Sequence, residues 1–186
     1  MSLSPISDAL DALRAGRPVI VDAGAAITDG NGGDTINILA RTAELRAGTG
    51  IGSGLAGDAG DIDSTVTGDL AAQTDTGNIN LHNVGSLTIG TLGTINGVEI
   101  LDILDNNNGE DITILAASPL TINSPVVDNA GGDIVLTAAD DGGSDDDLTI
   151  SANVTALGGN GGIDLNAGTD LIINNDVTVS TVGNGA

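Results

Sequence analysis

Apolar and polar residues alternate along the chain in short phrases that recur over most of its length. In DITI from Asp111 and in DIVL from Asp133, two aliphatic residues are separated by one intervening position. This period of two is typical of a short strand with one buried face. Gly, Asn, Asp and Ser lie between the phrases and turn the chain at little steric cost. The sequence therefore predicts many short strands joined by tight corners.

The phrases come in pairs, and the pairs repeat. The first phrase of each pair contributes Ile36, Ile62, Ile79, Ile112, Ile134 and Ile163, and the second contributes Leu45, Leu70, Leu87, Leu120, Leu148 and Leu171. The interval within a pair is 8 or 9 residues in every pair except Ile134 to Leu148, where it is 14. A third apolar point often follows six residues later, at Ile51, Val126, Val154 and Val177. Three short strands per repeat predict one coil of a triangular parallel β-helix, with coils stacked about 4.8 Å apart.

Two insertions interrupt the repeat. The long interval places one near residues 138–147, where AADDGGSDD lengthens a corner. The other, near residues 91–110, contains an apolar stretch, Val98 to Leu104, that we expect to add a strand or short helix of its own.

The N-terminus has a different pattern. Ser4 is a suitable N-cap and Gly16 a suitable C-terminal residue for a helix. A solenoid end exposes unpaired strands, so a helix here would serve as a cap. We therefore expect residues 1–22 to form a capping helix and the first strand, within RPVIVDA from Arg17 to Ala23, and residues 23–186 to form the parallel β-helix.

Composition narrows the kind of core. The chain of 186 residues has no aromatic residue and no cysteine, and its apolar residues are almost all Ile, Leu, Val and Ala. Aromatic side chains fill the large volumes of a compact globule. Their absence indicates a thin core in which small aliphatic side chains stack on copies of themselves.

Charge limits the partners. The formal net charge is −22, and the only basic residues are four arginines in the first quarter of the chain. Nucleic acid is excluded as a partner, because binding to phosphates requires a basic face. An anionic membrane surface is disfavoured, because it would repel this acidic chain. No apolar run reaches membrane-spanning length, and no basic segment followed by an apolar core marks a signal peptide. We expect a fragment of a longer exported protein, with cations as natural partners of its surface.

The quoted repeats resemble the repeat region of filamentous haemagglutinin-like proteins, large exported bacterial adhesins of two-partner secretion systems. The similarity is carried by RTAELRAGTGIGSG from Arg41, GDLAAQTDTGNINLHNVGSLTIGT from Gly68, GDIVLTA from Gly132 and GGIDLNAGTDLII from Gly161. The resemblance covers roughly residues 23–186 and implies a right-handed parallel β-helix, secretion, and a role in adhesion or cell–cell contact. The NPNL and NPNGI motifs of the family's secretion domain are absent, so the segment would belong to the rod.

The strongest candidate for a metal site is the acidic run of the lengthened corner, formed by Asp140, Asp141, Asp145, Asp146 and Asp147. Clustered carboxylates suit Ca²⁺, but charge runs are usually solvated, so the sequence favours a solvated corner over a Ca²⁺ site. GNGGDTI, residues 30–36, matches part of a calcium-binding nonapeptide but occurs once, which favours a corner. Asp102, Asp105 and Glu110 surround a second oxygen-rich loop without EF-hand spacing.

Enzymatic function is disfavoured. Some β-helix hydrolases combine an Asp pair with histidine and lysine motifs; here Asp140–Asp141 supplies the pair, but there is no lysine. His82 is the sole histidine, in LHN, and we expect it to point to solvent. No G-x-S-x-G motif or cysteine offers a nucleophile.

Together with this resemblance, the sequence predicts a structural rod segment of a secreted bacterial surface adhesin, without catalysis. Its expected partners are host or partner-cell surface molecules, including glycans, and neighbouring coils of the parent protein. The alternatives are a Ca²⁺-dependent or glycan-binding module that uses the inserted loops and, third, a glycan-degrading β-helix enzyme.

Overall fold

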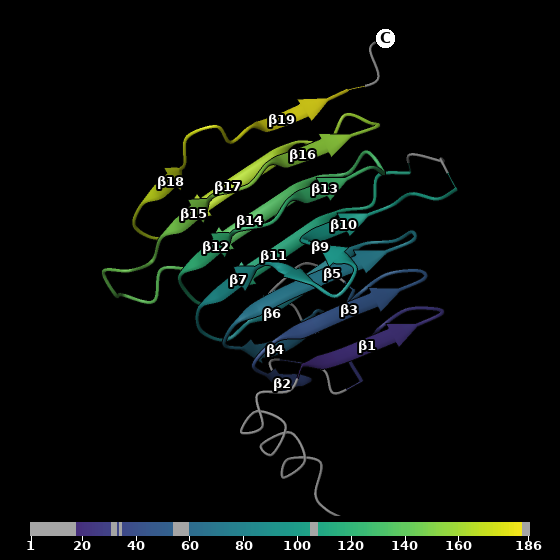
Figure 1. The fold of residues 1–186 in the computed structure, drawn as a ribbon, viewed down its shortest axis with the longest axis horizontal. Coiled ribbons are helices and arrows are strands. Elements are labelled where there is room, and N and C mark those ends of the chain that lie inside the picture. The colour runs from purple at the N-terminus through teal and green to yellow at the C-terminus, as the bar shows by residue number, and fades with distance from the viewer. Residues whose placement is uncertain (1–17, 31–32, 34, 54–59, 105–107, 184–186) are drawn as a thin grey trace, which may run out of the picture.

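A computed structural model describes residues 18–30, 33, 35–53, 60–104 and 108–183. Over these residues the chain is an all-β parallel solenoid of about six turns, and no helix occurs in this part. Successive strands rise from one end of the stack to the other (Figure 1). The predicted parallel stacking of short strands is therefore confirmed.

Sheet B is the simpler of the two large sheets, because each turn contributes one strand to it. Its strands run in the order β17–β14–β11–β6–β4–β2. They are β2 (Ile38–Ala40), β4 (Ile62–Val66), β6 (Ile79–Asn83), β11 (Ile112–Ala116), β14 (Ile134–Ala138) and β17 (Ile163–Ala167).

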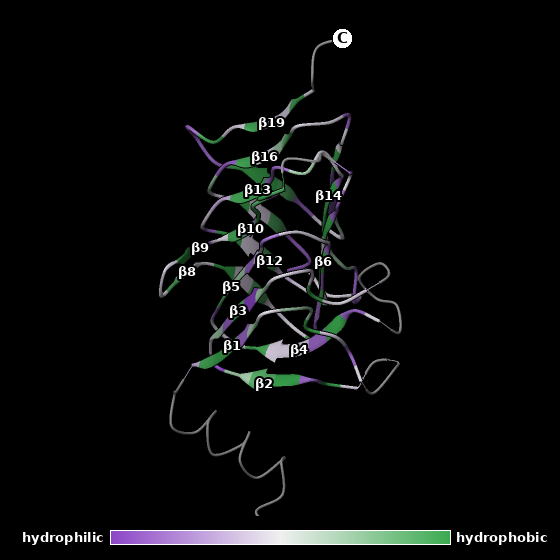
Figure 2. Cartoon of the chain, turned by 90° about the vertical axis from the view of Figure 1, so that its right-hand side faces the viewer, coloured by the Kyte–Doolittle hydropathy of each residue, from purple (hydrophilic) through white to green (hydrophobic). Residues whose placement is uncertain are grey.

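Sheet A has eleven strands and lies across the core from sheet B (Figure 2). They are β1 (Val19–Ala23), β3 (Ala43–Ala47), β5 (Asp69–Thr74), β7 (Leu87–Ile89), β10 (Val98–Ile100), β12 (Leu120–Ile122), β13 (Val126–Asp128), β15 (Leu148–Ile150), β16 (Val154–Leu157), β18 (Leu171–Ile173) and β19 (Val179–Val182). The first half of β5 pairs with β7 and the second half with β10. From there onward each turn places two strands in sheet A, which gives the predicted three strands per coil.

Aliphatic columns fill the space between the sheets in the later coils. Leu87, Leu120, Leu148 and Leu171 are cross-strand partners in sheet A, and Ile79, Ile112, Ile134 and Ile163 are partners in sheet B. Because each column repeats one residue type, adjacent side chains have the same shape and stack closely. The predicted columns are confirmed for these four coils.

The earlier coils do not follow the predicted alignment in sheet B. The repeat places Ile62 opposite Ile79, but Ile62 pairs with Leu81 instead. The reason is that Ile51 occupies the position opposite Ile79 and also bridges Ile27 on its other side. The next described strand of sheet B, β4, is displaced by two residues as a result.

Sheet A shows the same two-residue offset at its start. Leu45 pairs with Ala72, and Leu70 pairs with Ile89, so neither leucine belongs to the Leu87 column. In addition, Ile36 lies before β2, 37% exposed, and does not begin a strand.

The third apolar column was predicted correctly only in part. Val126 pairs with Val154 as expected, but the next member is Val179 and not Val177. Val98 is the preceding member. The stretch from Val98 is thus not an added element, because Val98–Ile100 is the regular strand β10.

The true insertion near residue 91 is an antiparallel hairpin, β8 (Thr91–Leu92) and β9 (Ile95–Asn96). It lies against the outward face of sheet A, since the Arg46 guanidinium on β3 donates to Thr94 Oγ1 at 3.0 Å. Ala71 also faces outward, yet it is fully buried, and Ile95 is only 1% exposed. The hairpin is therefore a cover for sheet A.

The expected helical cap lies outside the described residues. The first described strand, β1, pairs with β3 in parallel and in register. Within the described part of the chain, no helix has the length and apolar character needed to cross a membrane.

Leu148→Ala tests the aliphatic columns. Leu148 is fully buried between Leu120 and Leu171. Its truncation leaves a cavity and is expected to reduce the free energy of unfolding by about 3 kcal/mol. Thr149→Ala, one residue along the same strand but on the outward face, is the matched control and should cost less than about 1 kcal/mol. Chemical denaturation measures both, and equal losses would contradict the stacked core.

Candidate functional site

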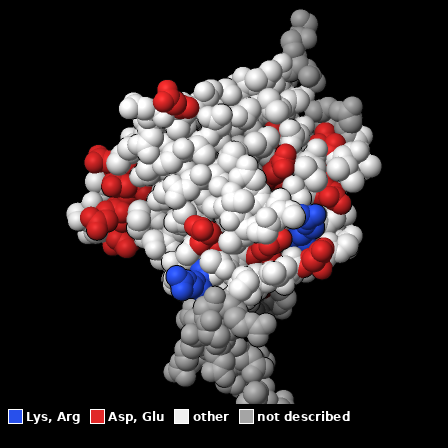
Figure 3. All heavy atoms as spheres, in the orientation of Figure 1, with Lys and Arg blue, Asp and Glu red and all other residues white. Residues whose placement is uncertain are grey.

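The acidic run predicted as a Ca²⁺ site forms the corner between β14 and β15. Asp140, Asp141 and Asp145 are exposed there. Figure 3 shows acidic side chains gathered at the edge of the molecule, where this corner projects in Figure 1. Asp140 Oδ1 and Asp141 Oδ1 each accept a hydrogen bond of 2.9 Å from the backbone N–H two residues later. These carboxylates thus stabilise the turn itself.

The last two aspartates of the run connect the corner to its neighbours. Asp146 is 2% exposed, and its Oδ2 accepts from the Asp141 N–H at 3.3 Å. Asp147 Oδ1 accepts from the N–H of Asp170, in the next coil, at 3.1 Å. These contacts support the alternative of a structural corner, while Ca²⁺ binding here stays a prediction.

The other two predicted oxygen-rich segments lie partly outside the described residues. Asp105 is not described, while Asp102 and Glu110 are 7% and 8% exposed. Residues 31, 32 and 34 of the GNGGDTI segment are not described either.

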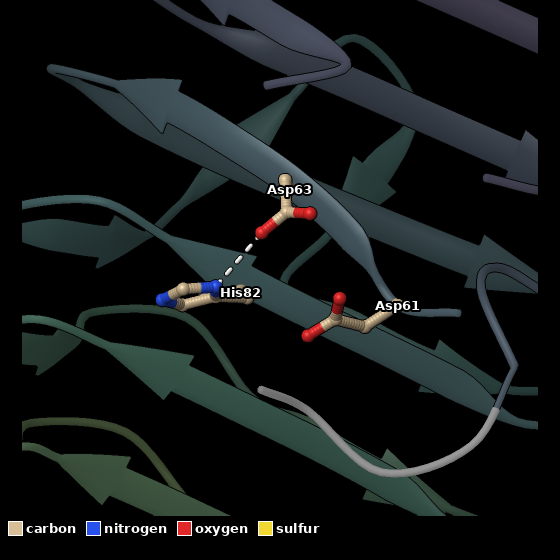
Figure 4. A group of neighbouring side chains, drawn as sticks. All are labelled: Asp61, Asp63 and His82. Atoms are coloured by element: carbon tan, nitrogen blue, oxygen red, sulfur yellow. Dashed lines mark hydrogen bonds and ion pairs between the residues drawn. The ribbon is translucent and has the colours of Figure 1, made fainter. Parts of the chain in front are cut away.

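The structure brings together a different group, Asp61, Asp63 and His82 (Figure 4). One ligand atom from each side chain lies within 4.8 Å of the other two, and among the described residues no other group of His, Asp or Glu side chains meets this condition. Asp63 Oδ1 lies 2.8 Å from His82 Nδ1. This group was not predicted from the sequence.

The register of β4 on β6 creates the group. Because Ile62 pairs with Leu81, Asp63 lies directly opposite His82 on the outward face of sheet B. Residues two apart on a strand share a face, so Asp61 lies beside Asp63, and Asn80 lies beside His82. The motifs D-x-D and N-x-H thus form two adjacent pairs on neighbouring strands.

The group is buried although it faces away from the core. Asp61 and Asp63 are each 1% exposed, Asn80 is fully buried, and the His82 side chain is 17% exposed. Gly52, which follows Ile51 in the chain, lies next to both Asp61 and Asn80. The Ser53 N–H donates to the Gly60 carbonyl at 2.6 Å. We expected His82 to point to solvent, and this was wrong, because most of the surface of its side chain is buried.

Several polar atoms in this region lack hydrogen-bond partners. Asp63 Oδ2 and both side-chain polar atoms of Asn80 are buried without one. By contrast, the backbone of Asp63 is well held: its N–H donates to Asn37 Oδ1 at 2.8 Å, and its carbonyl accepts from the Asn37 N–H at 2.9 Å. A buried, unpaired carboxylate oxygen is costly, so its position needs an explanation.

The hydroxyl of Ser64 is held away from the Asp63–His82 pair. Ser64, the nearest hydroxyl in sequence, points to the inward side, where its Oγ donates to Asn83 Oδ1 at 2.9 Å. Asn83 Oδ1 also accepts from the Val66 N–H at 2.8 Å, so this contact holds β4 to β6. Asp63 and His82 therefore pair a carboxylate with an imidazole, but Ser64 does not offer them its hydroxyl as a nucleophile.

A second buried carboxyl occupies the core itself. Asp128 is fully buried and lies in a core column between its partners Ile100 and Ala156. Its Oδ1 accepts from the Ala130 N–H at 2.7 Å, whereas Oδ2 has no partner.

Burial raises the pKa of Asp128 to about 7. Hydrogen bonds from the backbone of Ala130 and Gly132 oppose this rise in pKa, and the charges of Asp111 and Glu110 add to it. Neutral Asp128 is thus favoured in the folded chain below about pH 7.

Comparison with known proteins finds no match: no family model, curated protein or solved structure is significantly similar to the chain. The resemblance to haemagglutinin-like repeats therefore stays a prediction.

Asp128→Asn is expected to remove a pH dependence of stability. Between the unfolded pKa of 3.8 and the folded pKa of about 7, the folded chain binds more protons than the unfolded chain. The contribution of Asp128 to the free energy of unfolding therefore falls as the pH rises through this window, and it stays constant above the window. The melting temperature of the variant relative to wild type should rise from pH 4 to about 7.

Asp164→Asn, at an exposed position on β17, is the control for the loss of one acidic side chain. Thermal melts at several pH values measure the difference between each variant and wild type. The same difference profile for both variants would contradict a specific role of Asp128.

Proposed function

We propose that the chain is a structural rod segment of a secreted bacterial surface adhesin, which spaces or presents surfaces for cell contact and catalyses no reaction. The observation that carries this proposal is the last described coil. Leu171 and Ile173 are 45% and 48% exposed, whereas their column partners Leu148 and Ile150 are fully buried. A further coil of the same kind would cover these side chains and pair with β18.

The repeat architecture supports a role that depends on the number of stacked coils and not on a single binding cleft. Each coil contacts its neighbours through backbone ladders and like side chains, so coils can be added without a change of fold. A right-handed, three-sided cross-section and a helix near residues 4–16 that caps the first coil are parts of the same proposal. So are the extracellular location and partners on host or bacterial cell surfaces.

Appending a copy of residues 133–162 after Ala186 tests whether the last coil accepts another. The four residues 183–186 plus Asp133 match the five residues 158–162 that join β16 to β17. The added coil is expected to raise the melting temperature, because burial stabilises each covered aliphatic side chain by about 1.5–3 kcal/mol. A shuffled copy of the same residues is the control, and an equal effect of both would contradict the proposal.

A second candidate function, Ca²⁺-dependent or glycan binding, is favoured by one observation. The corner with Asp140, Asp141 and Asp145 projects from the rod and is exposed (Figure 3). Binding of the labelled chain to glycan arrays and cells, with and without millimolar Ca²⁺, distinguishes the two functions. A rod segment should give background signal, whereas binding that is lost in Asp141→Asn would favour the second.

A further inference from the structure

We propose that Asp61, Asp63 and His82 bind one divalent transition-metal cation, of the Zn²⁺ type, which fastens β4 to β6. The proposal is independent of the adhesin assignment. It concerns a site that is separate from the acidic corner and lies on the outward face of sheet B (Figure 4).

The three side chains form a mixed set of ligands. Two carboxylates and one imidazole, with ligand atoms within 4.8 Å of one another, provide three oxygen and nitrogen donors. Zn²⁺ takes four such donors at about 2.0–2.2 Å. Ca²⁺ prefers six to eight oxygen ligands and gains little from imidazole. The mixed set therefore favours a transition-metal cation.

The buried polar atoms around the group also favour a cation. Asp63 Oδ2 has no hydrogen-bond partner although Asp63 is 1% exposed. Asn80 is fully buried with neither side-chain polar atom paired, and it lies on the same face, next to His82 in β6 and near Asp61 through Gly52. A cation would give Asp63 a partner, and the Asn80 amide oxygen is positioned as a candidate fourth ligand.

The charge of the group favours a cation as well. Asp61 and Asp63 place two carboxylates, each on a residue that is 1% exposed, within 4.8 Å of each other and of His82. Two like charges held close together at low exposure repel each other, and a divalent cation would balance both of them.

The geometry requires a small adjustment. Ligand atoms in a tetrahedral zinc site lie about 3.3 Å apart, whereas Asp63 Oδ1 and His82 Nδ1 are 2.8 Å apart. The cation would replace the proton that these two atoms share, and the two side chains would separate by about 0.5 Å. The low exposure of the carboxylates fits a closed structural site better than a catalytic site with an open position.

His82 makes the test unusually direct, because it is the only histidine of the chain and there is no cysteine. In chelator-treated, untagged protein, a long-range ¹H–¹⁵N spectrum should show a single imidazole. Its ring signals are expected to change on addition of one equivalent of Zn²⁺ and then to saturate. An unchanged imidazole at saturating Zn²⁺ would overturn the proposal without any variant.

Calorimetric titration with Zn²⁺ provides the second measurement. Wild type should bind one cation, and His82→Gln and Asp63→Asn should each lose about tenfold or more in affinity. Variants are compared only if their circular dichroism spectra match wild type. The double variant Asp141→Asn, Asp145→Asn is the matched control for adventitious binding at the exposed corner, and it should keep wild-type affinity.

Two outcomes of this titration contradict the proposal. Loss of binding in the corner variant, with no loss in His82→Gln, would place the cation at the acidic corner. Binding of Ca²⁺ as tight as that of Zn²⁺ would refute the assignment to a transition metal. Under the proposal, saturating Zn²⁺ also raises the melting temperature of wild type by about 5 °C, and it does not raise that of His82→Gln.

Discussion

The in-register stacking of parallel strands is the constraint on which the rest of this molecule depends. A strand in the stack satisfies its backbone groups with the coils above and below it, and it places alternate side chains into a narrow core. The core has room for aliphatic residues repeated in columns, such as those of Ile134 and Leu148, and the chain contains no aromatic residue. Every other feature either preserves this register or marks a place where it changes.

The parts of the fold that were predictable from the sequence are those where the register stays constant. From β6 and β7 onward, the repeated isoleucines and leucines correspond to the first two spatial columns, so counting along the chain gave the correct partners there. In the third column the count gave Val177, whereas the structure has Val179. Before β6 the count fails, because Ile51 takes a place in sheet B that the repeat assigns to Ile62. The sequence shows that both residues are apolar, but it does not show which of them meets Ile79.

The Asp61–Asp63–His82 group illustrates how that offset affects function. With the alignment expected from the repeat, Asp63 would face Asn80, and His82 would have no acidic neighbour from β4. The displacement by two residues brings the carboxylate to the imidazole. The signal available in the sequence was the pair of motifs D-x-D and N-x-H on consecutive strand phrases, which becomes informative only when the register is known. The acidic corner, by contrast, was conspicuous in the sequence because its charges are adjacent along the chain.

Strand β5 has a consequence for how such a molecule can change in length. Below it, each turn crosses sheet A as one continuous strand, and above it each turn crosses as two. Among the described strands, β5 alone pairs with both kinds. Whole turns above β5 are interchangeable modules, so gene duplication or deletion there would leave every remaining junction matched. A duplication or deletion that included β5 would place a turn with one strand in sheet A against a turn with two. Strand β5 is therefore the fixed connection between the two kinds of turn.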